Sequence, residues 1–366
     1  MEQESKTRAV LELNQCAFEG VHPMSLTSSI RGLAILAAVG TVVAAAPAAA
    51  QLRIIVTEQT IPVVANSVHW LSDQLGYYER AGVEVEIIKV ADTPTAVTAL
   101  LAGEGDMANI AVTAALGIAA QNLADIRAVS SPDKFLPYTI VVNNSIVTPA
   151  DLTGKTFGVA AIGSLDYNLS QLVLRGLGVD PATVTFVPIA GGPAGRGQAL
   201  MAGQIDATTM SIGAFLGVPD KTNIRVAVTA PEFLALASVL NKVNVVRAEY
   251  LETNRADVVA FVTAITQLAR DFQANPQAWI DAMRVALPDY SAENLAIVAQ
   301  QLNGLWSVNG GMDLATIEAA VTRGYAGPDL AGMRMVEIGE WVDFTVADDV
   351  IAALGGVDPA GDPAGR

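Results

Sequence analysis

Residues 99–110 read ALLAGEGDMANI, and residues 199–210 read ALMAGQIDATTM. Alanine, leucine, alanine, glycine and aspartate fall at matching positions in the two stretches. Each stretch is typical of a helix end, a glycine that closes the helix, and a strand entered through an aspartate. Two interpretations are open. Any helix–glycine–strand corner has such a sequence, or the chain has two similar lobes that each present this corner to a shared cleft.

Short apolar runs alternate with helical patterns on both sides of the two stretches. Strands are expected at 52–56, 83–88, 107–110, 126–129, 138–142, 156–160, 184–189 and 205–209. Helices are expected at 68–81, 95–101, 111–121, 165–177 and 195–201. Strands separated by helices are typical of βαβ units. We therefore predict an α/β protein in which each lobe is a mostly parallel sheet flanked by helices.

The last third of the chain is expected to be helical. The predicted helices are 254–274, 276–286, 292–305, 314–325 and 335–344. Residues 355–366 are rich in glycine, proline and aspartate and are expected to form a flexible tail. We assign 51–138 and 233–354 to lobe 1 and 139–232 to lobe 2, with hinges near 136–142 and 226–239.

The N-terminal fifty residues are predicted to be a leader. Residues 24–50, MSLTSSIRGLAILAAVGTVVAAAPAAA, have the lone basic residue, apolar run and small-residue cleavage site of a signal peptide. Residues 1–23 are polar and lie upstream of that pattern, so we expect Met24 to be the true start and 1–23 to be a gene-model extension. The protein is therefore predicted to be exported to the periplasm.

The composition excludes several classes of site. The 366 residues carry a net charge of −16, with one cysteine and two histidines. Cys16 and His22 lie in the predicted leader, so the mature chain has no thiol and one imidazole, His69. A single cysteine excludes a disulfide framework or a cysteine-cluster metal site. An acidic chain is a poor partner for nucleic acid. We expect no metal, no cofactor and no nucleic-acid partner.

Four segments together resemble a known family of transport proteins. They are QLGYYERAGVEVEI (74–87), ALLAGEGDMANI, DLTGKTFGVAAIGSLDY (151–167) and ALMAGQIDA (199–207). In order and spacing they resemble the periplasmic substrate-binding proteins of ABC importers, in the subgroup that binds nitrate, sulfonates, taurine or thiamine precursors. The resemblance covers roughly 51–250. It implies a two-lobe, type II-like periplasmic-binding-protein fold with a helical C-terminal region, a small-molecule ligand, an ABC permease of the inner membrane as partner, and a monomer.

Candidate ligand-binding residues follow from where the predicted strands end. Ligands of open α/β sheets bind beyond the carboxyl ends of the strands. Most residues at those positions are neutral hydrogen-bonding groups, and Glu58 and Asp166 also allow an amine-bearing ligand. The candidates are Glu58, Gln59, Asn66, His69, Trp70, Thr93, Thr95, Asn109, Thr113, Tyr138, Ser164, Asp166, Tyr167, Gly192 and Ser211.

Three side chains have a structural alternative to a role at the ligand. Ser164 either contacts the ligand or only caps the helix that begins at Leu165. His69 is either a donor to the ligand or a polar residue at a helix start. Arg196 either binds an anionic ligand or pairs with carboxylates of its own lobe.

The leading functional hypothesis is a binding protein without catalysis. It would close two lobes on a small organic molecule (a sulfonate, a carboxylate or a pyrimidine-like compound) and deliver that molecule to the permease. One alternative is a periplasmic ligand-sensing protein of a signalling system. Another is an enzyme like the pyrimidine-precursor synthases that the resemblance also reaches. Those synthases use a cysteine-rich motif, which the mature chain lacks.

Overall fold

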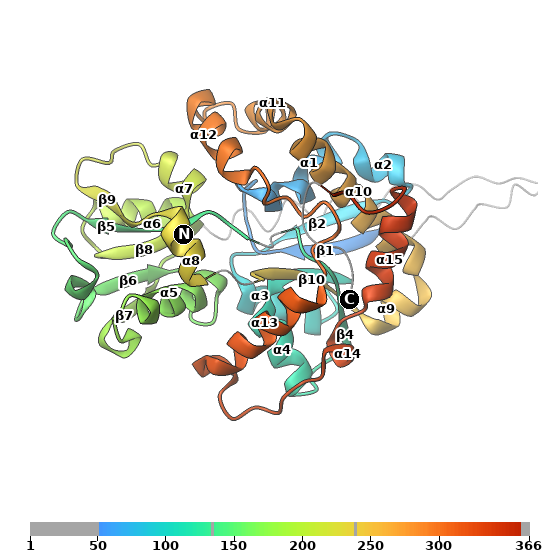
Figure 1. Ribbon diagram of the computed structural model, residues 1–366, viewed down its shortest axis with the longest axis horizontal. Coiled ribbons are helices and arrows are strands. Elements are labelled where there is room, and N and C mark those ends of the chain that lie inside the picture. The colour runs from blue at the N-terminus through green and yellow to red at the C-terminus, as the bar shows by residue number, and fades with distance from the viewer. Residues whose placement is uncertain (1–50, 133–134, 238–239, 360–366) are drawn as a thin grey trace, which may run out of the picture. The chain divides into compact units, whose positions relative to one another are not determined.

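The structure is a computed structural model that describes residues 51–132, 135–237 and 240–359 (Figure 1). The predicted leader and residues 360–366 of the predicted tail lie outside the described residues. In the described part, Gly356 O accepts a hydrogen bond from Arg270, and the backbone N–H of Asp358 donates to Asn309 Oδ1. No helix in the described ranges is long and apolar enough to span a membrane.

The strands of the described ranges form two five-stranded sheets with the same topology (Figure 1). The first sheet has the order β2-β1-β3-β10-β4, and the second has the order β7-β6-β8-β5-β9. The first comprises β1 (Leu52–Val56), β2 (Val85–Lys89), β3 (Met107–Ala111), β4 (Ile126–Ser130) and β10 (Lys242–Arg247). The second comprises β5 (Tyr138–Asn143), β6 (Thr156–Val159), β7 (Thr185–Pro188), β8 (Ala207–Ser211) and β9 (Ile224–Val228).

Each sheet contains one antiparallel strand in the equivalent place. Strand β10 runs against β3 and β4, and β5 runs against β8 and β9. Both strands have a register shift, between Asn244 and Val245 in β10 and between Ile140 and Val141 in β5. The prediction of mostly parallel sheets flanked by helices is confirmed. Strands β9 and β10 were not predicted from the sequence.

Helices flank both sheets (Figure 1). Those of the first sheet are α1 (Val68–Gln74), α2 (Tyr77–Ala81), α3 (Thr93–Leu101), α4 (Val112–Ala120), α9 (Ala248–Thr253), α10 (Arg255–Ala274), α11 (Pro276–Ala286), α12 (Ala292–Leu302), α13 (Leu314–Ala326), α14 (Ile338–Trp341) and α15 (Phe344–Ala353). Those of the second are α5 (Leu165–Gly176), α6 (Gly192–Met201), α7 (Ile212–Leu216) and α8 (Ala230–Ala237). Short 3-10 turns are η1 (Ala65–Ser67), η2 (Pro149–Leu152), η3 (Pro181–Thr183) and η4 (Pro328–Leu330). We call each sheet with its helices lobe 1 and lobe 2, respectively.

Two helix predictions were wrong in detail. The helix expected at 68–81 is divided into α1 and α2 by Gly76, which adopts a φ of 70° that a helix interior does not allow. The helix expected at 335–344 is only the four residues of α14, and α15 follows it from Phe344. Asp343 caps α15 by accepting from the Thr345 N–H, which places the helix start later than hydrophobic spacing suggested.

The chain crosses between the sheets before β5 and before β10. The range 136–142, predicted as a hinge, lies mostly within β5, and the range 226–239 lies mostly within β9 and α8. The predicted lobe boundary at 232/233 falls inside α8, which packs against α5 and β5 of lobe 2.

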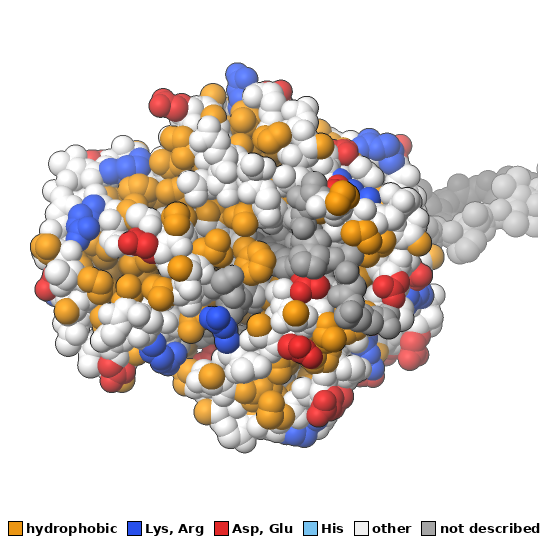
Figure 2. Space-filling model, in the orientation of Figure 1, with side chains coloured by type: hydrophobic (Ala, Val, Ile, Leu, Met, Phe, Trp, Pro, Cys, Tyr) orange, Lys and Arg blue, Asp and Glu red, His pale blue; other side chains and the backbone are white. Residues whose placement is uncertain are grey.

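The largest core lies in lobe 1, between its sheet and the long helix α10. The α10 side chains Val258, Phe261, Ile265 and Leu268 recur at helical spacing and are all buried. Trp279 on α11 is fully buried, and its indole N–H donates to Ser67 Oγ at 3.0 Å. On the face drawn in Figure 2, charged side chains are scattered singly among apolar and neutral ones. This pattern matches a chain in which 16% of residues are charged.

The repeated corner of the sequence is the same structural device in both lobes. Gly103 and Gly203 have φ values of 76° and 69°, and each closes its helix with a backbone hydrogen bond to Leu100 or Leu200. The aspartate that follows ties two strands together. Asp106 Oδ2 accepts from the Arg53 N–H, and Asp206 Oδ2 accepts from the Thr156 N–H.

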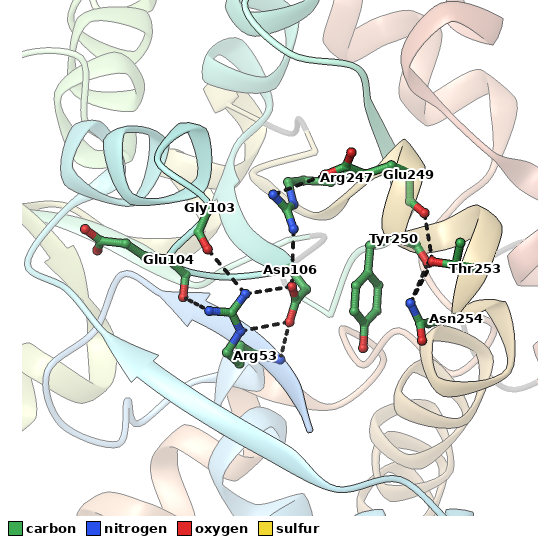
Figure 3. Close-up of polar contacts among 9 residues, drawn as sticks. All are labelled: Arg53, Gly103, Glu104, Asp106, Arg247, Glu249, Tyr250, Thr253 and Asn254. Carbon is green, nitrogen blue, oxygen red and sulfur yellow. Dashed lines mark hydrogen bonds and ion pairs between the residues drawn. The ribbon is translucent and has the colours of Figure 1, made fainter. Parts of the chain in front are cut away.

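These corners lie at the amino ends of the parallel strands, so the part of the second interpretation that places them at a ligand cleft is wrong. Asp106 precedes β3 and bonds to the start of β1, at the edge opposite the carboxyl ends. Figure 3 shows its carboxylate between the guanidinium groups of Arg53 and Arg247. The hydrogen bond to Asp106 raises the pKa of Arg53. The two-lobe interpretation of the repeat is therefore correct, but the role of the repeat is to hold each sheet together.

Candidate functional site

A buried ion pair lies at the carboxyl edge of the first sheet. The loop after β1 carries Thr57 and Glu58, and β10 begins at Lys242. Because β10 is antiparallel, Lys242 pairs with Ala111 at the carboxyl end of β3. The Lys242 ammonium donates to Thr57 Oγ1 and to Glu58 Oε1, and its side chain is 5% exposed. The positive charge of Lys242 is therefore paired with a carboxylate inside the protein.

Three asparagines connect this ion pair to His69. Asn66 Nδ2 donates to Glu58 Oε1 at 3.0 Å and to Asn109 Oδ1 at 3.2 Å. Asn109 Nδ2 donates to Asn244 Oδ1 at 2.8 Å, and His69 Nε2 lies 3.2 Å from the same oxygen. Asn66, His69, Asn109 and Asn244 are all fully buried. We call Glu58, Asn66, His69, Asn109, Lys242 and Asn244 the edge network.

The carboxylate fixes the direction of every hydrogen bond in the edge network. A carboxylate only accepts, so the Asn66 atom beside Glu58 must be the NH2 group. The same reasoning passes along the asparagines to Asn244, whose oxygen faces Asn109 and whose Nδ2 donates to Ser130 Oγ at 2.9 Å. His69 Nε2 must therefore carry the proton. Glu58 Oε2, Asn66 Oδ1 and His69 Nδ1 are buried and have no hydrogen-bond partner among the described residues.

The imidazole of His69 is packed on its other side by aromatic rings. Its ring stacks on Phe261 with centroids 6.0 Å apart, and the Tyr78 hydroxyl donates to the His69 carbonyl at 2.9 Å. Burial lowers the pKa of His69 to about 4. The imidazole is therefore neutral at the pH of ordinary growth.

This pKa predicts a loss of stability in mild acid. The unfolded imidazole titrates near 6.5, so between that pH and about 4 the unfolded chain binds a proton that the folded chain does not. The free energy of unfolding should therefore decrease as the pH is lowered, by about 2 kcal/mol from pH 7 to pH 5. Urea unfolding of the chain from residue 51 measures it at both pH values. His69→Gln should lack this part of the pH dependence. Equal slopes for the two proteins would show that His69 is not held neutral.

The second lobe has a polar cluster at the corresponding edge. Asp166 on α5 accepts from the Ala160 N–H at 2.9 Å and from Ser164 Oγ, and its Oδ2 lies 3.5 Å from the Arg196 guanidinium. Arg196 is 4% exposed and also donates to Thr208 Oγ1 at 3.1 Å. Arg196 thus pairs with a carboxylate of its own lobe, which is the structural alternative given above. Ser164 occupies the N-cap position of α5, but its hydroxyl bonds Asp166 and the Ala161 carbonyl instead of capping the helix.

The two lobes touch through α5 and α4. Asn168 Nδ2 on α5 donates to Thr113 Oγ1 on α4 at 2.9 Å. Asp329 in η4 also interacts with Asn168, and burial raises the pKa of Asp329.

The lobes also touch through α7, which faces α12 and the loop after β1. The Tyr290 hydroxyl donates to the Gly213 carbonyl at 2.6 Å, and Asn294 Nδ2 donates to the Leu216 carbonyl at 3.0 Å. A Cβ atom at Gly213 would lie 2.5 Å from the Val63 carbonyl oxygen. The loop that carries Glu58 therefore runs on into the contact with lobe 2.

The structure joins some predicted site residues and separates others. Four of them, Glu58, Asn66, His69 and Asn109, belong to the edge network, and Ser164 and Asp166 share the lobe 2 cluster. The others have different surroundings: Gln59 is exposed, Trp70 has a buried indole N–H without a described partner, Thr93 is buried at the start of α3, Thr95 bonds Asp92, Thr113 accepts from Asn168 of lobe 2, Tyr138 packs on Phe233, Tyr167 packs on Phe186, Gly192 begins α6, and Ser211 caps α7.

Sequence reasoning missed Lys242 and Asn244. Residues 242–247 read KVNVVR, an alternation of polar and apolar residues that is typical of a strand. Treating it as an antiparallel strand would have placed Lys242 and Asn244 beside the carboxyl ends of the other strands. Across the described ranges, no group of three or more His, Cys, Asp or Glu side chains is placed to hold a metal ion.

Comparison with known proteins gives one family match. A family model described as NMT1/THI5 like matches residues 69–279. No curated protein matches the sequence.

Solved structures share the fold at low sequence identity. A protein from Bordetella bronchiseptica RB50 is 19% identical, with a TM-score of 0.70 over 84% of this chain and 98% of that chain. The ligand-binding component of an ABC-type import system from Staphylococcus aureus, solved with zinc bound, is 14% identical, with a TM-score of 0.61 over 82% and 98%. The periplasmic aliphatic sulphonate binding protein from Escherichia coli is 17% identical, with a TM-score of 0.59 over 80% and 92%. The predicted two-lobe periplasmic-binding-protein fold is thereby confirmed.

Proposed function

The chain belongs to the NMT1/THI5-like family, and from this we propose that it is the periplasmic solute-binding component of an ABC importer. It binds one small organic molecule between its lobes and delivers it to a membrane permease, with no chemical step. The similar structures support this proposal, because two of them are an import-system ligand-binding component and a periplasmic sulphonate-binding protein.

The observation that carries the proposal is the edge network. Buried polar groups in proteins are almost always hydrogen-bonded, yet two oxygens of this network have no described partner. They lie where the carboxyl ends of β1 and β3 meet the start of β10, which is where α/β sheets bind ligands. A ligand held there would satisfy them.

The ionisable groups around the site favour binding over catalysis. Lys242 is held by Glu58, and Arg196 by Asp166. Burial keeps His69 neutral with a pKa of about 4, too low for an efficient base near neutral pH. We propose that the protein works as a monomer in the periplasm, exported through the leader that the sequence predicts.

Native mass spectrometry of the protein purified from the periplasm tests the proposal. We expect a single small molecule to copurify. Adding that molecule at 100 times its Kd should stabilise the ligand-free protein by about 2.7 kcal/mol in a thermal unfolding scan. Reconstitution with the permease encoded beside it should then give ligand-dependent ATP hydrolysis. The proposal fails if nothing copurifies and no sulfonate, carboxylate, pyrimidine or amine raises the Tm. Binding without stimulation of a permease would favour a sensing role.

A further inference from the structure

The edge network leaves two buried oxygen acceptors without a hydrogen-bond partner among the described residues. The forced direction of its hydrogen bonds uses both protons of the Asn66 amide and directs the Lys242 ammonium at Thr57 and Glu58. What remains on the carboxylate and on the first asparagine is Glu58 Oε2 and Asn66 Oδ1, both buried acceptors without a described partner. A ligand that satisfies them must bring hydrogen-bond donors.

The two buried cations near the carboxyl edges of the sheets are each already paired with a carboxylate. The Lys242 side chain is 5% exposed and paired with Glu58, and the Arg196 side chain is 5% exposed and lies 3.5 Å from Asp166. An anion with no donor of its own would approach the free oxygen of a carboxylate, and a nearby like charge is unfavourable. The net charge of −16 adds no compensating attraction.

We propose that the ligand presents at least one N–H donor to Glu58 Oε2 and Asn66 Oδ1, as an amine, an amidine or an amino-substituted heterocycle does. This inference rests on the proposed function and narrows its ligand class. Nitrate and simple alkanesulfonates carry no donor and would leave both oxygens without a partner. An acidic group elsewhere on the ligand is compatible, provided that an N–H group faces Glu58.

Matched pairs of probes test the inference on the unmodified protein. Each pair differs by one amino group: ethanesulfonate with 2-aminoethanesulfonate, propionate with 3-aminopropionate, and pyrimidine with 4-aminopyrimidine. A charge-assisted hydrogen bond should make at least one amino member bind about 10- to 100-fold more tightly than its partner in calorimetry. Binding of nitrate or ethanesulfonate as tight as that of every amino probe would overturn the inference. It would leave the proposed function intact, whereas no binding of any probe and no copurified ligand would count against both.

Glu58→Gln tests which residue receives the donor. Glutamine keeps an oxygen toward Lys242 and Asn66 and replaces the free Oε2 with an NH2 group. We expect the amino probes to lose about 10- to 100-fold in affinity and their partners to lose none, so the preference disappears or reverses. Glu84→Gln, on an exposed glutamate, is the control and should change nothing. An unchanged preference in a folded Glu58→Gln protein would overturn the inference. If that variant does not fold, the matched pairs on the unmodified protein still decide.

Discussion

Replacing Gly213 by alanine is expected to weaken ligand binding by about 10- to 100-fold without unfolding either lobe. The added Cβ would lie 2.5 Å from the Val63 carbonyl oxygen and 2.8 Å from Val63 Cβ, and such contacts force a shift. Gly213 lies on α7 of lobe 2, whereas Val63 belongs to the loop after β1 of lobe 1. The clash therefore exists only when the lobes are in contact, and the substitution acts against closure.

Helix propensity separates this effect from loss of stability. Gly213 has no positive φ, so alanine suits α7 and should stabilise lobe 2 slightly when the lobes are apart. Gly339→Ala is the matched control, because a Cβ on that helical glycine meets nothing within 4 Å. Tyr290→Phe removes only the hydrogen bond to the Gly213 carbonyl and should cost less affinity than Gly213→Ala. Calorimetry gives the affinities, and small-angle scattering gives the change in radius on adding ligand. Unchanged affinity in Gly213→Ala would mean that this contact plays no part in closure.

The fold could be predicted where its signals are local. The strand from 52 to 56, the glycine stop at 103 and the aspartate at 106 are all visible within a few residues of sequence. Strand β10 was missed because its partners are remote. The chain leaves β4 at Ser130, builds all of lobe 2, and returns at Lys242. No pattern of short range marks such a return.

The candidate site was predictable as a set of positions but not as a network. The rule about carboxyl ends of strands selected Glu58, Asn66 and Asn109, and the structure connects them by hydrogen bonds. The partner that neutralises Glu58 is 184 positions away, on the strand that was missed. Charge alone therefore suggested an open carboxylate, whereas the structure leaves only one of its two oxygens open. Asp166 had the same apparent freedom and is in fact enclosed by Arg196 and Ser164.

Replacing Asp106 by alanine should destabilise the protein by about 3 kcal/mol while leaving ligand affinity unchanged. The Asp106 side chain is 6% exposed and accepts hydrogen bonds from the backbone and the guanidinium of Arg53, with Arg247 3.5 Å away. Its removal leaves the backbone N–H at the start of β1 without that acceptor. Binding should be unaffected, because Asp106 lies at the amino edge of the sheet and the edge network lies at the opposite edge.

Asp206→Ala is the matched comparison, because Asp206 occupies the position in the second repeat that Asp106 occupies in the first. Although partial burial raises its pKa, hydrogen bonds from Thr156 and Asn143 lower the pKa of Asp206 overall. Its donors are neutral, so we expect a smaller loss than for Asp106, about 1–2 kcal/mol. Asp289→Ala, on an exposed residue, is the control for both variants. Urea unfolding measures the losses and calorimetry measures the affinities. Weaker ligand binding in folded Asp106→Ala or Asp206→Ala would mean that the repeated corners do take part in ligand binding. Full affinity with reduced stability would instead mean that the repeated corner stabilises the sheet of each lobe. The residues at the opposite, carboxyl edges can then differ between the lobes.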